Sequence, residues 1–316
     1  MSITGRVVAF CVVVVLAGCG AEDARPEALP ASAAVTPSAA APSTAAPSAA
    51  APSAAAPSAP TLEAAPAPVA RPGERPPGAL PPVRRHGPRG PKRVALTFDA
   101  DMTDAMIARL RRGAVTSYAN LTLLGQLEQG EIPATFFVTG QWAEQYPQVM
   151  RRIAGNPRFE VANHSYEHAA FTAGCYTLPQ LPAAKMTDDV ARTFRTLEPF
   201  GGRQTRYFRF PGLCHDRAAL RALAPLGVTV IDGDVVSGDP FARSAAPVVR
   251  AVLSQVRPGS IVIMHLTEAN ARYTDEALPK ILAGLRERGL EPVTLSELLG
   301  ERPAPATPPS ADPTVG

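Results

Sequence analysis

The chain has 316 residues, of which 46% are hydrophobic and 35 are Pro, and it carries a formal net charge of +3. This small charge comes with basic residues spread along the chain and no phosphate-binding glycine loop, so we expect no nucleic-acid partner. The segment able to fold, residues 92–300, has the length of one domain with a single substantial core.

The N-terminus has the features of a bacterial export signal. Arg6 precedes an apolar run from Val7 to Ala17, which is too short to span a bilayer comfortably. The run ends in Leu-Ala-Gly-Cys, which resembles the lipobox in which the Cys is lipidated and becomes the first mature residue. We predict a signal peptide over residues 1–19 and an extracytoplasmic lipoprotein anchored to the cell membrane through Cys19. The alternative is an ordinary cleaved signal with an incidental Cys.

Two segments lack the composition of a packed core. Residues 20–91 are mostly Ala, Pro and Ser, with a repeated Ala-Ala-Pro-Ser unit. Because Pro removes backbone donors and small side chains have little surface to bury, we predict a disordered stalk there. Residues 301–316, which contain Pro-Ala-Pro and Pro-Pro-Ser, are predicted to be a disordered tail.

Between these segments, short β-forming runs alternate with helical segments. Strands are predicted at residues 94–98, 134–138, 159–161, 207–210, 228–231, 261–264 and 292–293. Helices are predicted at residues 121–128, 148–154, 187–197, 217–226, 247–256 and 276–288. Strands separated by helices imply a parallel sheet, and this many units in one domain favour an α/β barrel-like closure over an open sheet.

Two histidines follow the third predicted strand. His164 and His168 lie in Asn-His-Ser-Tyr-Glu-His, and this spacing turns both rings toward one point on a helical turn or in a tight loop. Most pairs at this spacing are unrelated side chains, but the chain has only five His and this pair leaves the end of a strand. We therefore expect a metal site at the carboxyl edge of the sheet, where parallel α/β folds place their chemistry.

Ionisable residues also follow four other predicted strands. They are Asp99 and Asp101, Arg209, Asp232 and Asp234, and His265. Singly, each has a structural explanation such as a turn residue, a surface ion pair or a satisfied core His. A barrel gathers its strand ends on one face, so five such ends together predict a shared site.

These motifs resemble, in order, those of the NodB-type polysaccharide deacetylases, carbohydrate esterase family 4. The resemblance covers about residues 94–299 and is carried by Thr97–Asp101, His164–His168, Arg209–Gly212, Asp234–Asp239 and Ile263–His265. It implies a distorted (β/α) barrel in which one Asp and two His hold a divalent metal, usually Zn²⁺. It also implies a hydrolase of carbon-nitrogen bonds other than peptide bonds, which removes N-acetyl groups from peptidoglycan or chitin-like amino sugars, or O-acetyl groups from xylan.

The resemblance assigns roles to four residues. Asp99 is the general base that takes a proton from water, and Arg209 orients Asp99 and keeps it ionised. His265 protonates the departing amine. The backbone N–H of Gly212 lies where the family has its oxyanion donor.

The fourth motif supplies an acidic partner for His265. This partner is Asp239 or Asp234, with Asp239 as our choice, and it raises the pKa of His265 so that the ring starts protonated. The family's groove-lining Asp-Trp is replaced by Asp239-Pro240. A stacking surface for a sugar is thereby lost, so we expect an unusual acceptor or a glycan held by inserted loops such as residues 171–182.

The first motif departs from the family at the metal ligand. Ala100 stands where the family places its ligating Asp, and Ala cannot coordinate a metal. We predict that Asp101 joins His164 and His168 instead, provided that the backbone turns slightly. The alternative is that Asp101 caps the next turn, which would leave two protein ligands and weak binding.

Cys175 and Cys214 are predicted to form a disulfide. Both lie in the exported domain, where oxidation is permitted, and each follows a site motif by a few residues. Two free thiols are the alternative.

The function that we expect is that of an active, metal-dependent deacetylase, a monomer acting on cell-wall or another acetylated polysaccharide. A catalytically silent domain that binds glycan is one alternative, and bound metal with acetate release distinguishes the two. A hydrolase of a small N-acyl amide is another, which activity on small N-acyl compounds alone would reveal.

Overall fold

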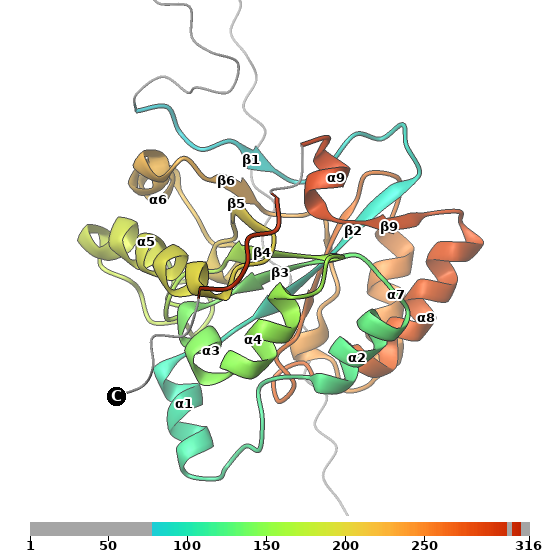
Figure 1. Cartoon of the computed structure of the whole chain (residues 1–316), viewed down its shortest axis with the longest axis horizontal. Helices are drawn as coiled ribbons and strands as arrows, with labels where there is room; N and C mark the ends of the chain where they lie inside the picture. The colour runs from blue at the N-terminus through green and yellow to red at the C-terminus, as the bar shows by residue number, and fades with distance from the viewer. Residues whose placement is uncertain (1–77, 302–304, 311–316) are drawn as a thin grey trace, which may run out of the picture. The chain divides into compact units, whose positions relative to one another are not determined.

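The structure is a computed structural model and describes residues 78–301 and 305–310 (Figure 1). The predicted signal peptide, Cys19 and most of the predicted stalk lie outside the described residues. Among the described helices, none combines the length and the apolar character that crossing a membrane requires.

One parallel sheet forms the centre of the described part. Its strands are β1 (Val83–Arg84), β2 (Arg93–Ala100), β3 (Ala134–Val138), β4 (Phe159–Asn163), β5 (Gln204–Phe208), β6 (Thr229–Ile231), β7 (Val235–Val236), β8 (Ile261–His265) and β9 (Glu291–Val293). They follow the order β1-β6-β5-β4-β3-β2-β8-β7, with β9 also paired to β2. The sheet curls into a half barrel with helices around it (Figure 1), which confirms the expected α/β barrel-like fold.

Helices connect the strands and cover the outside of the half barrel. They are α1 (Asp104–Arg111), α2 (Leu121–Gln129), α3 (Gly140–Gln145), α4 (Pro147–Ala154), α5 (Met186–Leu197), α6 (Arg217–Leu223), α7 (Ala245–Gln255), α8 (Thr274–Glu287) and α9 (Leu295–Leu299). In Figure 1, α5 and α6 lie at the left of the half barrel and α2, α7 and α8 at its right. The sequence did not reveal α1, because this short helix is polar on average and, of its apolar residues, only Met106 is buried while Ile107 and Leu110 are partly so.

The pleat of the strands divides the core into two layers. Leu96, Phe98 and Ala100 of β2 face the outer layer, between sheet and helices. Alternate residues face inward, where a second cluster consists of Ala95, Phe137, Ala162, Tyr207, Ile231, Ile261, Val293, Leu295 and Leu298. The backbone N–H of Leu295 donates to Thr135 Oγ1 near the start of β3, so α9 closes the amino end of the half barrel. The carboxyl end of the half barrel stays open, and the site described below lies there.

At both ends, the folded part extends beyond the domain of residues 92–300 that the sequence predicted. Val83–Arg84, inside the predicted stalk, pairs with β6, and Gly87 N–H donates to Gly259 O over 2.8 Å. Inside the predicted tail, Thr307 pairs with Gly202. Backbone hydrogen bonds hold much of these segments, with Val83 also packed against the core, so their composition did not reveal them.

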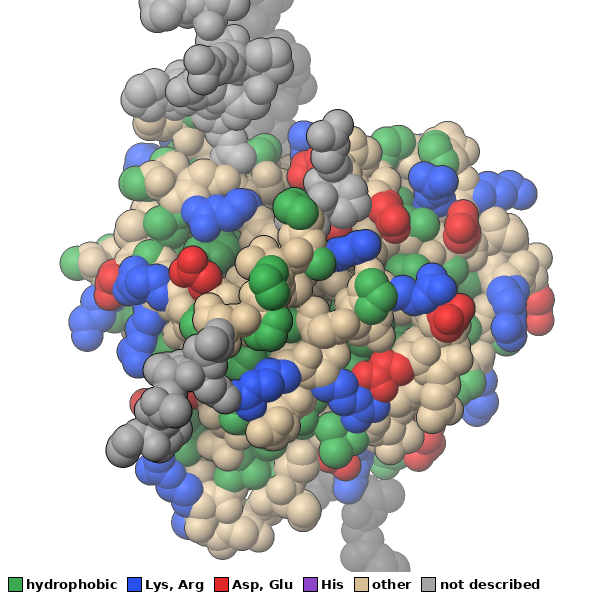
Figure 2. All heavy atoms as spheres, in the orientation of Figure 1, with side chains coloured by type: hydrophobic (Ala, Val, Ile, Leu, Met, Phe, Trp, Pro, Cys, Tyr) green, Lys and Arg blue, Asp and Glu red, His purple; other side chains and the backbone are tan. Residues whose placement is uncertain are grey.

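The face of the molecule drawn in Figure 2 carries Lys and Arg side chains interspersed with Asp and Glu. Ion pairs such as Arg158–Glu131 contribute to this mixture. Exposed pairs of this kind contribute little to stability, and the mixture agrees with the small net charge.

Candidate active site

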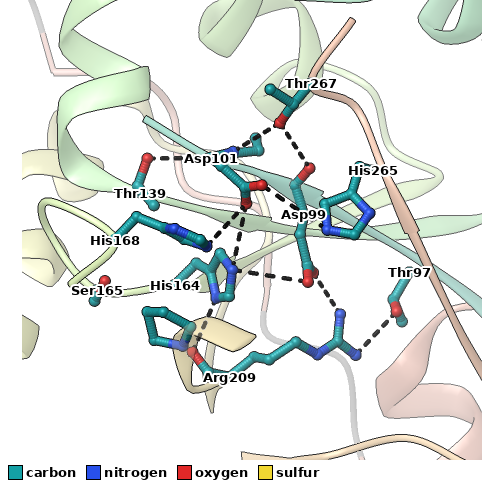
Figure 3. Close-up of polar contacts among 12 residues, drawn as sticks. Thr97, Asp99, Asp101, Thr139, His164, Ser165, His168, Arg209, His265 and Thr267 are labelled. Carbon is teal, nitrogen blue, oxygen red and sulfur yellow. Dashed lines mark hydrogen bonds and ion pairs between the residues drawn. The ribbon is translucent and has the colours of Figure 1, made fainter. Parts of the chain in front are cut away.

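Side chains from four strand ends meet at the carboxyl edge of the sheet (Figure 3). Asp99 is in β2 and Asp101 directly follows it, His164 and His168 follow β4, Arg209 follows β5, and His265 ends β8. Figure 3 shows His164, His168 and His265 around the Asp101 carboxylate. The structure therefore brings together six of the strand-end residues that the sequence singled out.

Asp101, His164 and His168 form a cluster that fits a metal ion. The ligand atoms of all three lie within 4.8 Å of one another, and each histidine Nε2 is 3.4 Å from Asp101 Oδ1. This Oδ1 is buried and accepts no hydrogen bond from the described residues. A buried carboxylate oxygen without a donor is costly, and a cation bound between it and the two rings would remove that cost.

The pleat of β2 explains why Asp101, and not Ala100, reaches the cluster. Side chains alternate along a strand, so Asp99 and Asp101 point inward while Ala100 faces the outer core, where it is fully buried. The backbone N–H of Asp101 donates to Thr267 Oγ1 over 3.0 Å, which fixes the residue at the strand end. Asp101 thus lies on the same face as Asp99 because of ordinary strand geometry.

The histidine pair lies in a tight loop. His164 Nδ1 is 2.9 Å from the carbonyl oxygen of Arg209, which can only accept, so Nδ1 carries the proton and Nε2 is free to bind a metal. Ser165 and His168 have φ of +70° and +56°, in the left-handed region that non-glycine residues rarely adopt. The Ser165 N–H donates to Asn163 Oδ1 over 2.9 Å and supports this bend.

Asp99 is held by a buried arginine. Arg209 is fully buried and its Nη1 is 2.5 Å from Asp99 Oδ1. Further contacts fix the guanidinium, including a hydrogen bond to Thr97 Oγ1 and a ring contact with Phe137. The other carboxylate oxygen, Oδ2, lies 3.7 Å from His164 Nε2. Asp99 is thus an oriented carboxylate beside the candidate metal cluster.

His265 is held by a buried carboxylate on the other side of the cluster. Its Nδ1 and its backbone N–H each lie 2.8 Å from an oxygen of Asp239. Ser237 and Thr274 hydroxyls also donate to Asp239, each over 2.7 Å. The Nδ1 proton therefore points at Asp239, and Nε2 faces the cluster at 3.8 Å from Asp101 Oδ2.

Burial and the neighbouring charges together give His168 and His265 different protonation states. Burial lowers the pKa of His168 to about 4, with Asp101 only partly opposing it, so the ring is neutral at pH 7. Burial also lowers the pKa of His265, but the charges of Asp239 and Asp101 outweigh it and raise that pKa to about 10. For Asp101, burial raises the pKa, yet the nearby imidazoles bring it well below its usual range. A neutral His and an ionised carboxylate are the forms that bind metal, and a protonated His is a general acid.

Two of the expected strand-end acids lie elsewhere. Asp234 precedes the unpredicted strand β7, pairs with Arg89 at 2.8 Å and accepts from the N–H of Ile261, at the amino end of β8. Asp232 lies 3.0 Å from His215 Nε2. The expectation that Asp234 shares the site is therefore wrong, whereas Asp232 does directly follow β6 at the carboxyl edge but binds His215. Of the two candidate partners for His265, Asp239 makes the contact. Because the short edge strand β7 begins just after Asp234, this residue lies at the amino edge of the sheet and not at the carboxyl edge.

A disulfide lies against the turn that contains Gly212. The Cys175 and Cys214 sulfurs are 2.11 Å apart, across Cα atoms 5.9 Å apart. Gly212 has φ +63°, and a Cβ there would be 2.7 Å from Cys175 Sγ. Only glycine fits this position, because a side chain would meet both a left-handed backbone and the bridge.

Sequence reasoning missed the hydroxyl groups that position the charged residues. Thr97 binds Arg209, Thr267 binds the Asp101 backbone, and Ser237 and Thr274 bind Asp239. Most of these partners are far apart in the chain, and Ser and Thr are too common to carry a signal. Thr97 and Ser237 stood within quoted motifs, Thr97–Asp101 and Asp234–Asp239, but nothing in those motifs marked their hydroxyl groups.

A half barrel with ionisable side chains at its carboxyl edge has the organisation of an α/β enzyme. The sequence model of the polysaccharide deacetylase family matches residues 86–231. A peptidoglycan-N-acetylglucosamine deacetylase of Bacillus cereus is 26% identical over 213 residues, 67% of this chain and 70% of that protein. A family 4 carbohydrate esterase from Streptomyces lividans, solved in complex with acetate, is 30% identical with a TM-score of 0.53, over 67% of this chain and 97% of that one. A family 4 pseudoenzyme from Bacillus anthracis has the same fold, at 24% identity, a TM-score of 0.57 and 72% coverage of both chains.

The chain belongs to the polysaccharide deacetylase family, carbohydrate esterase family 4, whose members are hydrolases.

Replacing Asp101 by Ala is expected to lower the affinity for Zn²⁺ by about a hundredfold or more, because a catalytic zinc site normally needs three protein ligands. Asp99→Asn should keep nearly the wild-type affinity, since Asp99 is bound to Arg209. Competition with a chromophoric chelator measures both. Equal affinities of Asp101→Ala and wild type would exclude Asp101 as a ligand, and a large loss in Asp99→Asn would assign that role to Asp99.

Replacing Asp239 by Asn is expected to lower the pKa of His265 from about 10, because the carboxylate that stabilises the imidazolium loses its charge. In the wild type the ring loses its proton only as the pH rises through about 10, and in the variant it does so at lower pH. NMR titration of the His265 ring in the wild type and the variant measures the shift. An unchanged titration of His265 would contradict the assignment of Asp239 as its partner.

Proposed function

We propose that this protein is a metal-dependent hydrolase that removes acetyl groups from an acetylated polysaccharide, with N-acetyl groups of peptidoglycan or chitin-like amino sugars as its substrates. One observation carries the proposal. The Asp101-His164-His168 cluster lies between a carboxylate held by arginine, Asp99, and a histidine held by carboxylate, His265. Amide hydrolysis needs both a base and an acid beside the acetyl group, and this arrangement supplies them.

Zn²⁺ is the metal that we propose, because two imidazoles and one carboxylate are a usual donor set of catalytic zinc. When bound, the ion would polarise the acetyl carbonyl and make water more acidic. Asp101, His164 and His168 would hold it. The hydrogen bond from His164 Nδ1 to the Arg209 carbonyl keeps that ring turned for this purpose.

The remaining residues would move protons and hold charge. Asp99 would take a proton from the attacking water, with Arg209 keeping the carboxylate oriented. The N–H of Gly212 would donate to the oxyanion that forms as water adds to the acetyl carbon. His265 would then give its Nε2 proton to the sugar nitrogen as the C–N bond breaks. Acetate and a free amine would result.

The substrate proposal is supported by the relatives, of which one deacetylates N-acetylglucosamine of peptidoglycan and another was solved with acetate. The fold alone does not decide activity, since a pseudoenzyme shares it. The presence together of an oriented base, a protonated histidine and three candidate metal ligands favours an active enzyme over a catalytically silent glycan-binding domain.

The metal-loaded protein is expected to release acetate from peptidoglycan fragments or chitooligosaccharides, and a chelator should abolish the release. Asp99→Asn and His265→Ala should each lower kcat by about a hundredfold or more. Asp232→Asn is the matched control and should retain wild-type activity, because Asp232 contacts His215 rather than the cluster. Bound metal without acetate release would indicate the silent domain. Activity on small N-acyl compounds alone would indicate the small-amide hydrolase.

We further propose that the protein acts as a monomer at the cell envelope, held to the membrane by lipid on Cys19. The Leu-Ala-Gly-Cys sequence supports this, and several acyl chains would be needed because one chain binds only marginally. Cells expressing the wild type should incorporate a fatty-acid probe into the protein, and Cys19→Ala should not and should be released from membranes. Equal labelling of the two proteins would refute the anchor.

A further inference from the structure

Two large aromatic side chains stand exposed side by side. Tyr176 and Phe241 are 69% and 74% exposed, more than the other exposed large hydrophobic residues of the described chain. Their ring centroids are 6.1 Å apart with planes 24° from parallel. Burying an aromatic ring is favourable, so two rings left in water and stacked at one place call for an explanation.

Tyr176 is fixed beside the expected oxyanion donor. It follows Cys175, whose bridge to Cys214 ties this loop to the turn at Gly212. A Cβ built on Gly212 would lie 3.0 Å from the Tyr176 ring, so the ring covers the space that this glycine leaves. The φ of Tyr176 is +50°, a costly conformation for a non-glycine residue that the surrounding structure maintains.

Phe241 is fixed beside the candidate acid. It ends the short 3₁₀ helix Asp239–Phe241, and the Phe241 N–H donates to Gly238 O over 3.1 Å. Asp239, two residues before it, is buried and bound to His265, Ser237 and Thr274. The two rings thus come from separate segments, one from the loop that the disulfide ties to the Gly212 turn and one from the segment that holds His265.

We propose that Tyr176 and Phe241 form an aromatic platform that stacks against a pyranose ring of the glycan next to the sugar being deacetylated. The proposal rests on the proposed function and deepens it, because it gives the site a preference for oligosaccharides over a single acetylated sugar. The C–H face of a pyranose is apolar and packs on an aromatic face, while its hydroxyls stay in water. The backbone that carries each ring is fixed, by the Cys175–Cys214 bridge beside Tyr176 and by the 3₁₀ helix that ends at Phe241, so little loop ordering is needed when the sugar binds.

A sugar fits this platform better than a protein does. Two aromatic side chains offer a few hundred Å² at most, well below the roughly 1,000 Å² of a specific protein interface. The platform also adjoins Gly212 and the Asp239 segment, so a chain of sugars can lie on it while one of its acetyl groups reaches the cluster.

The test uses the metal-loaded full-length protein and the variants Tyr176→Ala, Phe241→Ala and both together. The substrates are chitopentaose and the small ester 4-nitrophenyl acetate. The ratio of kcat/KM for chitopentaose to kcat/KM for the ester should fall about five- to tenfold for each single variant, mostly through KM. Phe241→Trp should retain the wild-type ratio. Leu80→Ala, which removes another exposed side chain before β1, is the matched control and should leave both activities unchanged.

Binding of chitopentaose, measured by calorimetry in the Asp99→Asn background, separates this proposal from the proposed function. If the wild type releases no acetate but Tyr176→Ala and Phe241→Ala weaken binding, the platform stands and the proposed function fails. Wild-type binding and an unchanged substrate ratio in the double variant would overturn the platform. An equal loss on both substrates would also overturn it, because it would show that the rings only support the fold of the site.

Discussion

The alternation of side chains along β2 is the constraint on which the site depends. This strand pairs with β3, β8 and β9, so its register is fixed from both sides. Outward residues such as Phe98 and Ala100 anchor it in the large core under the helices. Asp99 and Asp101 therefore have to point into the open end of the half barrel. A shift of one residue would bury two carboxylates in the apolar outer layer, at a cost of many kcal/mol.

Each charged group that borders the cluster is balanced by a partner that lies deeper in the protein. Arg209 is beneath Asp99, and Asp239 is beneath His265. Without Asp239, burial would favour the neutral form of His265. The partners are themselves held by hydroxyl and backbone groups, so the protonation pattern at the surface of the site is set by residues that no substrate would touch.

The loops carry the side chains at the edge of the site that do not come from the strand ends. The disulfide holds the loop bearing Tyr176 on the Gly212 turn, and a short 3₁₀ helix carries both the buried Asp239 and the exposed Phe241. The residues proposed for catalysis and for recognition are therefore neighbours in space although they belong to separate segments. Because the rigid sheet positions these loops, their sequences can change without disturbing the core.

The sequence alone determined the parallel α/β class, most strands and helices, and the residues at the strand ends, because hydrophobic periodicity and residue type are local properties. It also showed that Ala100 cannot be a ligand and that Asp101 stands next to it. Only the tertiary structure decided that the face of β2 carrying Asp99 and Asp101 points into the half barrel, that Asp239 rather than Asp234 binds His265, and that residues 83–91 belong to the fold. It also revealed the pairing of Tyr176 with Phe241. These outcomes depend on contacts between segments distant in the chain, and such contacts leave no periodic or compositional signal for local reasoning to detect.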